Sequence, residues 1–516
     1  MAFANCPVAT ASPGAPLAAS RSYLRRQPEH SLVYQLVAAE ADGVRAAVYR
    51  ASEHGRGLPR HVDKELDAFL NCGLLHRGFA RVVCRKCRAE HVVAFSCKGR
   101  GICPSCTGRR MADTASHLVD RVLPYASYRQ WVVTFSPRVR YHLAADPKLA
   151  SLALTESLRA IFGWQRSAAR RNGERPARAS STAAITFIQR FNSALELSLH
   201  FHVLIPDGVF IRDGDDPDAR PRFVELDPPT DEDVAALLGA IIERVTAMLK
   251  KRGRLDDDDL GDEPEPQLLM ALRPTRQRVV GSSEVEPLPR LCARKDGFSL
   301  HAGTAIHRND RVGLERLCRY GLRPPLAQGR LSRAPDGTIL YQMKRRYSDG
   351  RHVLRFEPAE FLLRLCALVP PRRFQMIRYA GLFAPHARGR HAITGRGMHD
   401  KKVPAESPPP KAPAPPKRAP DPSGPDDPAR ARRLDWATLM KRSFGIDVLS
   451  CPKCSSRMEL IATIEDAAVA RKILEHLGLP TRGPPSPSPW VRQPALPIEG
   501  LGPEAFEGVD PPSMFD

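Results

Sequence analysis

The sequence predicts an α+β fold that is divided into more than one domain. Its 516 residues exceed what a single hydrophobic core ordinarily organises. Residues 183–206 carry the apolar pattern of two β-strands, whereas residues 230–250 carry the pattern of an amphipathic helix. Strands interrupted by long helices are typical of α+β and of α/β layered domains, and the residues alone leave both arrangements open. Paired cysteines ahead of these elements predict an additional metal-binding module.

The N-terminal part is predicted to be helical around this cysteine-rich module. Apolar residues recur at helical spacing in 28–70 and again in 111–125, and residues 72–110 between them hold the cysteines. We therefore expect an N-terminal domain over 28–125. Residues 1–27, rich in alanine and proline, are expected to be disordered.

The central part of the chain alternates between strand and helix patterns. In order, it predicts a strand at 128–135, a helix at about 147–172, strands at 183–190 and 195–206, a helix at 230–250, a helix at about 309–321 and a hairpin across 338–356. A short polar turn at Asn192 and Ser193 separates the two adjacent strands, which predicts that they pair antiparallel. Thr230 and Asp233 resemble a capping box at a helix start. These elements define a predicted second domain over 126–395.

The C-terminal part changes composition twice. Proline, lysine, alanine and aspartate dominate residues 396–432, which is typical of an extended linker. A small C-terminal unit with a helix at 467–477 is predicted over 433–482. The proline-rich residues 483–516 are expected to be disordered.

Charge and hydropathy indicate the class of partner. Lysine and arginine total 78 against 57 acidic residues, a net charge of +21. This excess favours nucleic acid as the partner and, second, an anionic membrane surface. The sequence has no apolar stretch long enough for a transmembrane helix and no secretory signal, and its cysteines occur in close pairs. We therefore expect a cytoplasmic, metal-binding protein.

Two C-x2-C pairs are the most specific local signal. Cys84 and Cys87 form one pair, and Cys103 and Cys106 form the other, fifteen residues further on. Two such pairs can supply four thiolates to a tetrahedral Zn²⁺ ion, whose coordination shell is then complete. We therefore predict a structural zinc site from these four residues, with a redox dithiol or unrelated cysteines as the alternatives.

Four further cysteines are less clearly assigned. Cys72 and Cys97 lie in the same module, as buried thiols or as alternative zinc ligands. Cys451 and Cys454 form a C-x2-C pair with no second pair after it. Because one pair cannot saturate zinc, we interpret it as a relic or as a partner of ligands that the sequence does not identify.

Basic residues surround the cysteine module: Lys98, Arg100, Arg109 and Arg110. A zinc-binding module with such a surface can hold the phosphate backbone of a nucleic acid. An ordinary solvated face explains these residues equally well. We name them as candidate DNA contacts.

His200 and His202 are the main candidate catalytic pair. Side chains two residues apart on a strand point to the same face, and Phe201 between them should point into the core. Two imidazole nitrogens on one face suit a divalent ion with positions left open for a phosphate oxygen. The alternative is a pair of partly exposed histidines with no ligand.

The third ligand of such an ion is not fixed by the pattern. A hairpin that turns near residues 194–195 would place Gln189 opposite His200, so Gln189 is our candidate. Its other interpretation is a polar contact between strands. Glu196 and His301 are weaker candidates.

Several segments in series resemble the rolling-circle transposases of the insertion sequence ninety-one family and its common-region relatives. Residues 69–84 and 94–106 resemble the zinc-binding domain of that family, and 187–191 with 199–204 resemble its HUH segment (two histidines around a bulky apolar residue). Residues 314–320 with 323–325 resemble its tyrosine motif, and 444–447 with the nearby pair Cys451 and Cys454 resemble its C-terminal segment. The resemblance covers roughly 60–395 and 433–480. It implies that the protein is a DNA transposase, an enzyme that moves an insertion element, which is a mobile element, by DNA recombination.

The resemblance also implies a fold and a chemistry. HUH endonucleases have a central, five-stranded antiparallel sheet with flanking helices and a tyrosine on a helix beside the histidine strand. His200 and His202 would hold Mg²⁺ or Mn²⁺, and Tyr320 would attack single-stranded DNA to leave a 5′-phosphotyrosine and a free 3′-OH. Basic residues near this tyrosine would favour its phenolate and contact DNA: Arg316, Arg319 and Arg323.

The expected partners are single-stranded element ends that contain hairpins, target DNA and, in a homodimer, a second copy. The expected location is the bacterial cytoplasm, at the nucleoid, with no membrane association. Many relatives carry a second tyrosine four residues after the first, but Pro324 occupies that position here, which predicts a single-tyrosine enzyme.

Two other functions remain open at this stage. One is a plasmid or phage rolling-circle replication initiator that uses the same chemistry. The other is a non-catalytic zinc-ribbon DNA-binding protein. Without the resemblance, four other tyrosines would be equal candidates: Tyr128, Tyr141, Tyr341 and Tyr379.

Overall fold

The computed structural model describes residues 21–23, 25–52, 55, 57–174, 182–212, 221–255, 289–343, 352–394 and 436–484. The predicted linker over 396–432 lies outside the described residues. So do most of the predicted disordered N-terminus and nearly all of the predicted disordered tail.

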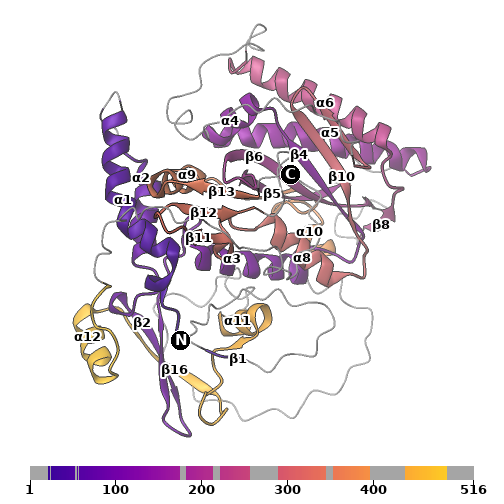
Figure 1. Ribbon diagram of the computed structural model, residues 1–516. Coiled ribbons are helices and arrows are strands. Elements are labelled where there is room, and N and C mark those ends of the chain that lie inside the picture. The colour runs from indigo at the N-terminus through magenta and orange to yellow at the C-terminus, as the bar shows by residue number, and fades with distance from the viewer. Residues whose placement is uncertain are drawn as a thin grey trace, which may run out of the picture.

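The centre of the molecule is a six-stranded antiparallel sheet (Figure 1). Its order is β14-β5-β6-β4-β10-β9, from β14 (Ile377–Gly381), β5 (Ala183–Phe191), β6 (Leu197–Pro206), β4 (Tyr128–Thr134), β10 (Phe298–Ile306) and β9 (Cys292–Lys295). The histidine strand β6 therefore lies inside the sheet, between β5 and β4. This arrangement confirms the predicted α+β class with a central antiparallel sheet and flanking helices.

The sheet has one more strand than the five that the resemblance implies. The short edge strand β9 pairs with β10 through a tight turn at Asp296 and Gly297. Both turn residues have a positive φ, 51° and 73°, which is the backbone conformation of a two-residue hairpin loop. The edge strand β9 is thus part of a local hairpin with β10.

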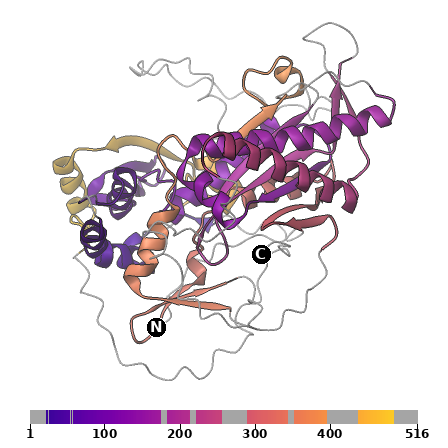
Figure 2. The ribbon, with the colours of Figure 1, turned by 90° about the horizontal axis from the view of Figure 1, so that it is seen from above.

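Helices cover both faces of the sheet. One face packs on α4 (Pro137–Ala145), α5 (Pro147–Arg171) and α6 (Asp231–Lys251), around Trp131, Phe201 and Ile241. Seen from above, α5 and α6 run side by side (Figure 2). The other face packs on the π-helical turn η3 (Leu118–Val122) and on α8 (Arg311–Gly321), around Tyr128, Phe187 and Leu314. The chemistry predicted from the sequence lies on this second face.

The N-terminal helices share a core with a segment from the second half of the chain. The helices α1 (Leu32–Ala51), α2 (Arg60–Leu70) and α9 (Pro358–Leu368) pack with a three-stranded sheet of β11 (Leu331–Arg333), β12 (Ile339–Gln342) and β13 (Val353–Phe356). The pairing of β12 with β13 confirms the predicted hairpin, although its turn lies outside the described residues. The N-terminal helices are thus packed against a region that follows the tyrosine motif.

A second three-stranded sheet joins the cysteine-rich N-terminal region to the C-terminal segment. Its order is β16-β2-β3, from β16 (Met458–Ile464), β2 (Phe79–Cys84) and β3 (Glu90–Ala94). The short elements around it are η1 (Pro28–His30), η2 (Leu75–Arg77), α3 (Pro104–His117), α11 (Trp436–Phe444), α12 (Ala467–His476) and the parallel pair β1 (Arg21–Ser22) and β15 (Ile446–Asp447). Figure 1 shows β16 and β2 side by side, below the central sheet. The sequence analysis did not predict this pairing.

The remaining elements are short: β7 (Gly208–Ile211), β8 (Arg222–Glu225), η5 (Gln328–Arg330) and α10 (Arg390–Ile393). The predicted capping box is confirmed, because the Thr230 hydroxyl accepts from Asp233 N and the Asp233 carboxylate accepts from Thr230 N. Among the described residues, none of the helices has the length and apolar character needed to cross a bilayer.

Candidate active site and metal centres

The two histidines lie on one face of β6, as the sequence predicts. Their Nε2 atoms are 3.1 Å apart, and their ring centroids are 5.0 Å apart. Phe201 points to the opposite face, where its ring lies 5.1 Å from that of Phe135 in the main core. Two ligand atoms at about 2.1 Å from one ion and at a right angle would lie about 3.0 Å apart. The measured spacing therefore fits two ligands of one divalent ion.

A hydrogen bond to the backbone determines which ring nitrogen of His200 carries the proton. The Nδ1 atom of His200 lies 2.9 Å from the carbonyl oxygen of Ser198, which can only accept, so Nδ1 carries the proton. Its Nε2 is then an acceptor. Burial lowers the pKa of His200 to about 4 and holds the pKa of His202 well below its usual value. Both rings are neutral, which is the form that binds a metal ion.

Gln189 lies directly opposite His200 in the register of β5 and β6, as the sequence predicts. Its amide nitrogen donates to the carbonyl oxygens of Tyr320 at 2.9 Å and Gly321 at 3.1 Å. Its Oε1 atom is buried and accepts no hydrogen bond in the described part of the chain. Gln189 thus connects the β5–β6 hairpin, which carries the two histidines, to the tyrosine helix α8, which carries Tyr320. Its unpaired oxygen is a type of ligand that cations such as Mg²⁺ accept.

Tyr320 lies near the C-terminal end of α8, next to the histidine pair. Its ring centroid is 5.6 Å from that of His202, and the two rings are nearly perpendicular, at 84°. The guanidinium of Arg323 lies 4.6 Å from the centroid of the Tyr320 ring and 5.4 Å from that of Phe191. The structure therefore brings together His200, His202, Gln189, Tyr320 and Arg323.

Gly321 explains how α8 approaches the sheet so closely. A Cβ atom at this position would collide with the ring of Phe187 on β5. Because glycine lacks that atom, the end of α8 reaches β5, and the carbonyl groups of Tyr320 and Gly321 come within hydrogen-bonding distance of Gln189.

The start of α8 is anchored separately. The Asp310 carboxylate accepts from Gly313 N at 2.7 Å and so caps the helix. Arg311 donates to the carbonyl oxygens of Leu123 at 2.9 Å and Pro124 at 3.1 Å, at the end of η3. Both ends of the tyrosine helix are therefore held by specific contacts.

Arg140 belongs to the site but was not predicted. Its guanidinium donates to the Ser198 hydroxyl at 2.9 Å. Together with Arg323, its charge also contributes to the lowered pKa of His200, after burial. Arg140 lies on α4, far from the motifs in sequence, and only the packing of α4 against β6 reveals it.

The predicted DNA contacts divide into two groups. Arg100 donates to the carbonyl oxygens of Pro371 at 2.9 Å and Phe374 at 2.8 Å, so its guanidinium holds two parts of the fold together. Arg110 donates to the Lys98 carbonyl at 2.7 Å, Arg109 to the Ser96 hydroxyl at 3.3 Å, and Arg319 to the Glu315 carboxylate at 2.7 Å. In contrast, the side chains of Lys98 and Arg316 are exposed.

The weaker ligand candidates lie elsewhere. The Glu196 carboxylate accepts from the Asn192 side chain at 2.8 Å, in the hairpin turn. His301 is on β10, with the whole of β4 between it and His202. Among the alternative tyrosines, Tyr128 is fully buried and donates to the Pro124 carbonyl at 3.0 Å, and Tyr341 is buried in the N-terminal core.

The predicted set of four zinc ligands is wrong in its grouping. Two clusters of four cysteines occur among the described residues, each with its sulfur atoms within 4.8 Å of one another. The internal cluster contains Cys72, Cys97, Cys103 and Cys106, and the composite cluster contains Cys84, Cys87, Cys451 and Cys454. Sequence proximity suggested that the two nearest pairs belong together. The folded chain instead pairs each with cysteines that the sequence left unassigned.

Both clusters fit the four-thiolate coordination of zinc. Nearest sulfur–sulfur distances are 3.4 to 3.7 Å in the internal cluster and 3.4 to 3.5 Å in the composite cluster. Four ligands at about 2.3 Å from a tetrahedral zinc ion lie about 3.8 Å apart. Cys103 precedes the first residue of α3, and Cys106 lies in its first turn.

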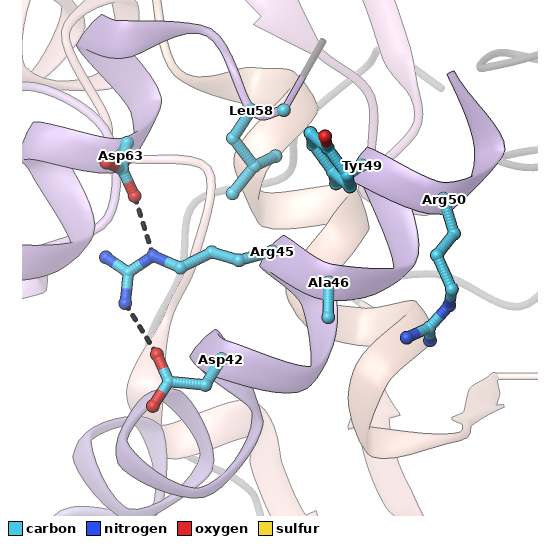
Figure 3. Close-up of a pocket in the computed structure, with 8 residues that line it drawn as sticks. Asp42, Arg45, Ala46, Tyr49, Arg50, Leu58 and Asp63 are labelled. Atoms are coloured by element: carbon cyan, nitrogen blue, oxygen red, sulfur yellow. Dashed lines mark hydrogen bonds and ion pairs between the residues drawn. The ribbon is translucent and has the colours of Figure 1, made fainter. Parts of the chain in front are cut away.

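A pocket lies between α1 and α2, away from these residues (Figure 3). Its main charged groups pair with each other: Arg45 donates to Asp63 at 2.7 Å and to Asp42 at 2.9 Å. None of the predicted site residues lines this pocket.

Comparison with known families identifies the class of protein. Residues 183–391 match a family model described as "Putative transposase", and residues 44–135 match one described as "Transposase zinc-binding domain". Together they span more than half of the chain. Searches of curated proteins and of solved structures returned no match.

The fold and these matches define a transposase with an N-terminal zinc-binding domain. The chain belongs to the insertion sequence ninety-one family of transposases, as the sequence analysis predicted. Membership implies DNA as its partner, and the zinc-binding-domain match together with the cysteine clusters supports Zn²⁺ as a bound ion.

Proposed function

We propose that this transposase cuts and rejoins single-stranded DNA at the ends of its element through a covalent bond between Tyr320 and a 5′-phosphate. The observation that carries the proposal is the placement of the Tyr320 ring 5.6 Å from His202, beside two imidazole nitrogens that are 3.1 Å apart. A nucleophile beside a two-histidine face is the arrangement that HUH-type cleavage requires.

A divalent ion fits the residues present, and Mg²⁺ and Mn²⁺ are the candidates. His200 and His202 would hold it through Nε2, and the unpaired Oε1 of Gln189 is a third donor. When bound, such an ion would polarise the scissile phosphate and neutralise developing charge.

The protein residues supply the nucleophile and its setting. The Tyr320 phenol gives up its proton to water and its oxygen forms a bond to phosphorus. The bond from phosphorus to the 3′ oxygen breaks, and the released 3′ oxygen takes up a proton from water, so that no proton is gained or lost overall. Arg323 on the Tyr320 ring and Arg140 beside Ser198 provide positive charge that attracts the phosphate backbone. A later 3′-OH reverses the step and joins strands without ATP.

The test is a search for the covalent adduct. Because the bond is to the 5′-phosphate, oligonucleotides from the element ends carry the label at their 3′ end and are incubated with protein and Mg²⁺ or Mn²⁺. We expect a labelled protein band on a denaturing gel that is lost, by roughly 10⁴-fold or more, in Tyr320→Phe.

Tyr379→Phe is the matched control. Tyr379 lies on strand β14 of the central sheet and, like Tyr320, has an arginine over its ring: the guanidinium of Arg390 lies 5.6 Å from the ring centroid. This variant should form the adduct normally. Cleavage without an adduct, or an unchanged adduct in Tyr320→Phe, would contradict the proposal.

A further inference from the structure

The composite cluster is built from two turns with the same hydrogen-bonding pattern. In the first, Arg88 N donates to Cys84 O at 2.9 Å and Cys84 N donates to Ala89 O at 2.8 Å. In the second, Ser455 N donates to Cys451 O and Cys451 N donates to Ser456 O, both at 2.9 Å.

Arg88 and Ser455 occupy equivalent positions, four residues after the first cysteine of each pair, and both have a φ of 57°. The left-handed conformation disfavours residues with a Cβ, and here it occurs twice at the same place. The two sulfur atoms of each turn face those of the other. The Sγ atom of Cys84 lies 3.5 Å from that of Cys454, and the Sγ atom of Cys87 lies 3.4 Å from that of Cys451. Two matched turns that face each other form a complete four-thiolate site.

The strands beside these turns are also paired. Met458 lies opposite Cys84, and the pairing of β16 with β2 continues to Ile464 opposite Phe79. The apolar cores at this interface are small. One contains Val82, Cys84, Ala89, Cys451 and Met458, and the other contains Leu75, Phe79, Val92, Ala470 and Leu474. Because so few apolar side chains are buried here, metal coordination is expected to contribute much of the stability.

The same C-terminal segment contacts the tyrosine helix. Arg442 on α11 donates to the Glu315 carboxylate at 2.9 Å on α8 and to the Asp120 carboxylate at 3.1 Å on η3. Ser443 accepts from Arg319 at 3.3 Å, also on α8. Only six residues separate the end of α11 at Phe444 from Cys451. A short segment therefore connects the composite cluster to α11, and α11 contacts the helix that carries Tyr320.

We propose that the composite cluster binds a second Zn²⁺ that fastens the C-terminal segment 436–484 to the zinc-binding domain and thereby holds α11 against the tyrosine helix. Half of this site, Cys451 and Cys454, lies outside both family matches. The metal site does not depend on the catalytic role of Tyr320, so it can be tested without DNA.

The first measurement is the zinc content of the full-length protein by native mass spectrometry. We expect two zinc ions per chain in the unmodified protein and one in Cys451→Ser/Cys454→Ser. Cys292→Ser is the control, because Cys292 is a partly buried cysteine on β9 that belongs to neither cluster, and it should retain two. One zinc ion in the unmodified protein, or two in the double variant, would overturn the proposal. The unmodified protein alone decides the first outcome even if the variant does not fold.

The second measurement asks whether zinc fastens the segment. A protease site inserted at about residue 415, within the predicted linker, allows the full-length protein to be cut after purification. The C-terminal fragment should co-elute with the rest of the chain in gel filtration and should bind at least about tenfold more weakly in Cys451→Ser/Cys454→Ser. Equal retention in both proteins would show that strand pairing alone suffices and would refute the fastening role.

The third measurement follows the contact with α8. Amide hydrogen exchange over residues 311–321 should be faster in Cys451→Ser/Cys454→Ser and in Arg442→Ala, and unchanged in Cys292→Ser. Unchanged exchange in both test variants would refute the connection to the tyrosine helix, whatever the zinc content. None of these readouts uses DNA cleavage, so they can fail or succeed independently of the proposed function.

Discussion

The proposed catalytic face, which comprises His200, His202, Gln189 and Tyr320, and the composite cluster both join residues that are far apart in sequence, but they do so by different forces. His202 and Tyr320 are brought together by an extensive apolar core, in which β5, β6 and α8 are packed on the interior of the molecule. Cys87 and Cys451, 364 residues apart, meet beside two cores of five buried residues each. We infer that hydrophobic packing maintains the proposed catalytic face, whereas the proposed metal coordination maintains the connection between the zinc-binding domain and the C-terminal segment 436–484.

Removal of zinc should have the largest effect and should separate the two regions. We expect a chelator to abolish hydrogen-exchange protection in β2, β3 and β16, whereas β5 and β6 remain protected, because large apolar cores cover both faces of the central sheet. The measurement is exchange followed by peptide mass spectrometry, with a zinc-repleted sample as control. Equal loss of protection in both sheets would remove the distinction between the regions.

Gly321→Ala should affect the catalytic face with little effect on zinc. The added methyl group meets the Phe187 ring, so the end of α8 must move away from β5 and Tyr320 moves with it. A displacement of about 1 Å can cost on the order of 100-fold in rate, and we expect a fall of about that size in adduct formation. Gly329→Ala is the control, because a Cβ atom there has no neighbour within 4 Å. If both variants keep full activity, close packing of α8 on β5 is not what positions Tyr320.

Gln189→Ala should have the smallest effect of the three. It removes the two hydrogen bonds to the carbonyl groups of Tyr320 and Gly321 and the proposed third metal donor. Adduct formation should fall about tenfold, in keeping with about 1–2 kcal/mol for the lost hydrogen bonds. The Mg²⁺ concentration needed for half-maximal adduct formation should rise. Gln130→Ala, at a position on β4 that is buried to a similar degree, should leave the Mg²⁺ requirement unchanged. An unchanged Mg²⁺ requirement in Gln189→Ala would limit its role to positioning.

Local sequence patterns were sufficient for much of the catalytic face. Alternation along residues 183–206 predicted both strands, and the symmetry of the hairpin predicted that Gln189 lies opposite His200. Helical spacing and the following prolines predicted α8 within two residues of its observed start. These features depend on neighbours in sequence, and such features can be predicted from one sequence.

Contacts between distant segments could not be predicted in the same way. Nothing near Arg140 in sequence indicates that α4 packs beside His200. The spacing of the cysteines gave the wrong partners, because β16 was not predicted to pair with β2 and that pairing brings Cys451 to Cys87. The strands β10 and β14 were also not predicted. Each pairs with a strand far from it in sequence, β10 with β4 and β14 with β5, and no tight turn connects either pair.

The position of β2 between β3 and β16 has a consequence for synthesis of the protein. Until the ribosome has released residues 458–464, one edge of β2 has no strand to pair with, and an unpaired edge is prone to join other chains. The sheet of the zinc-binding domain can therefore be completed only after residues 458–464 have been synthesised. A chain that ended before Cys451 would leave one edge of β2 without its partner strand and would hold half of a metal site.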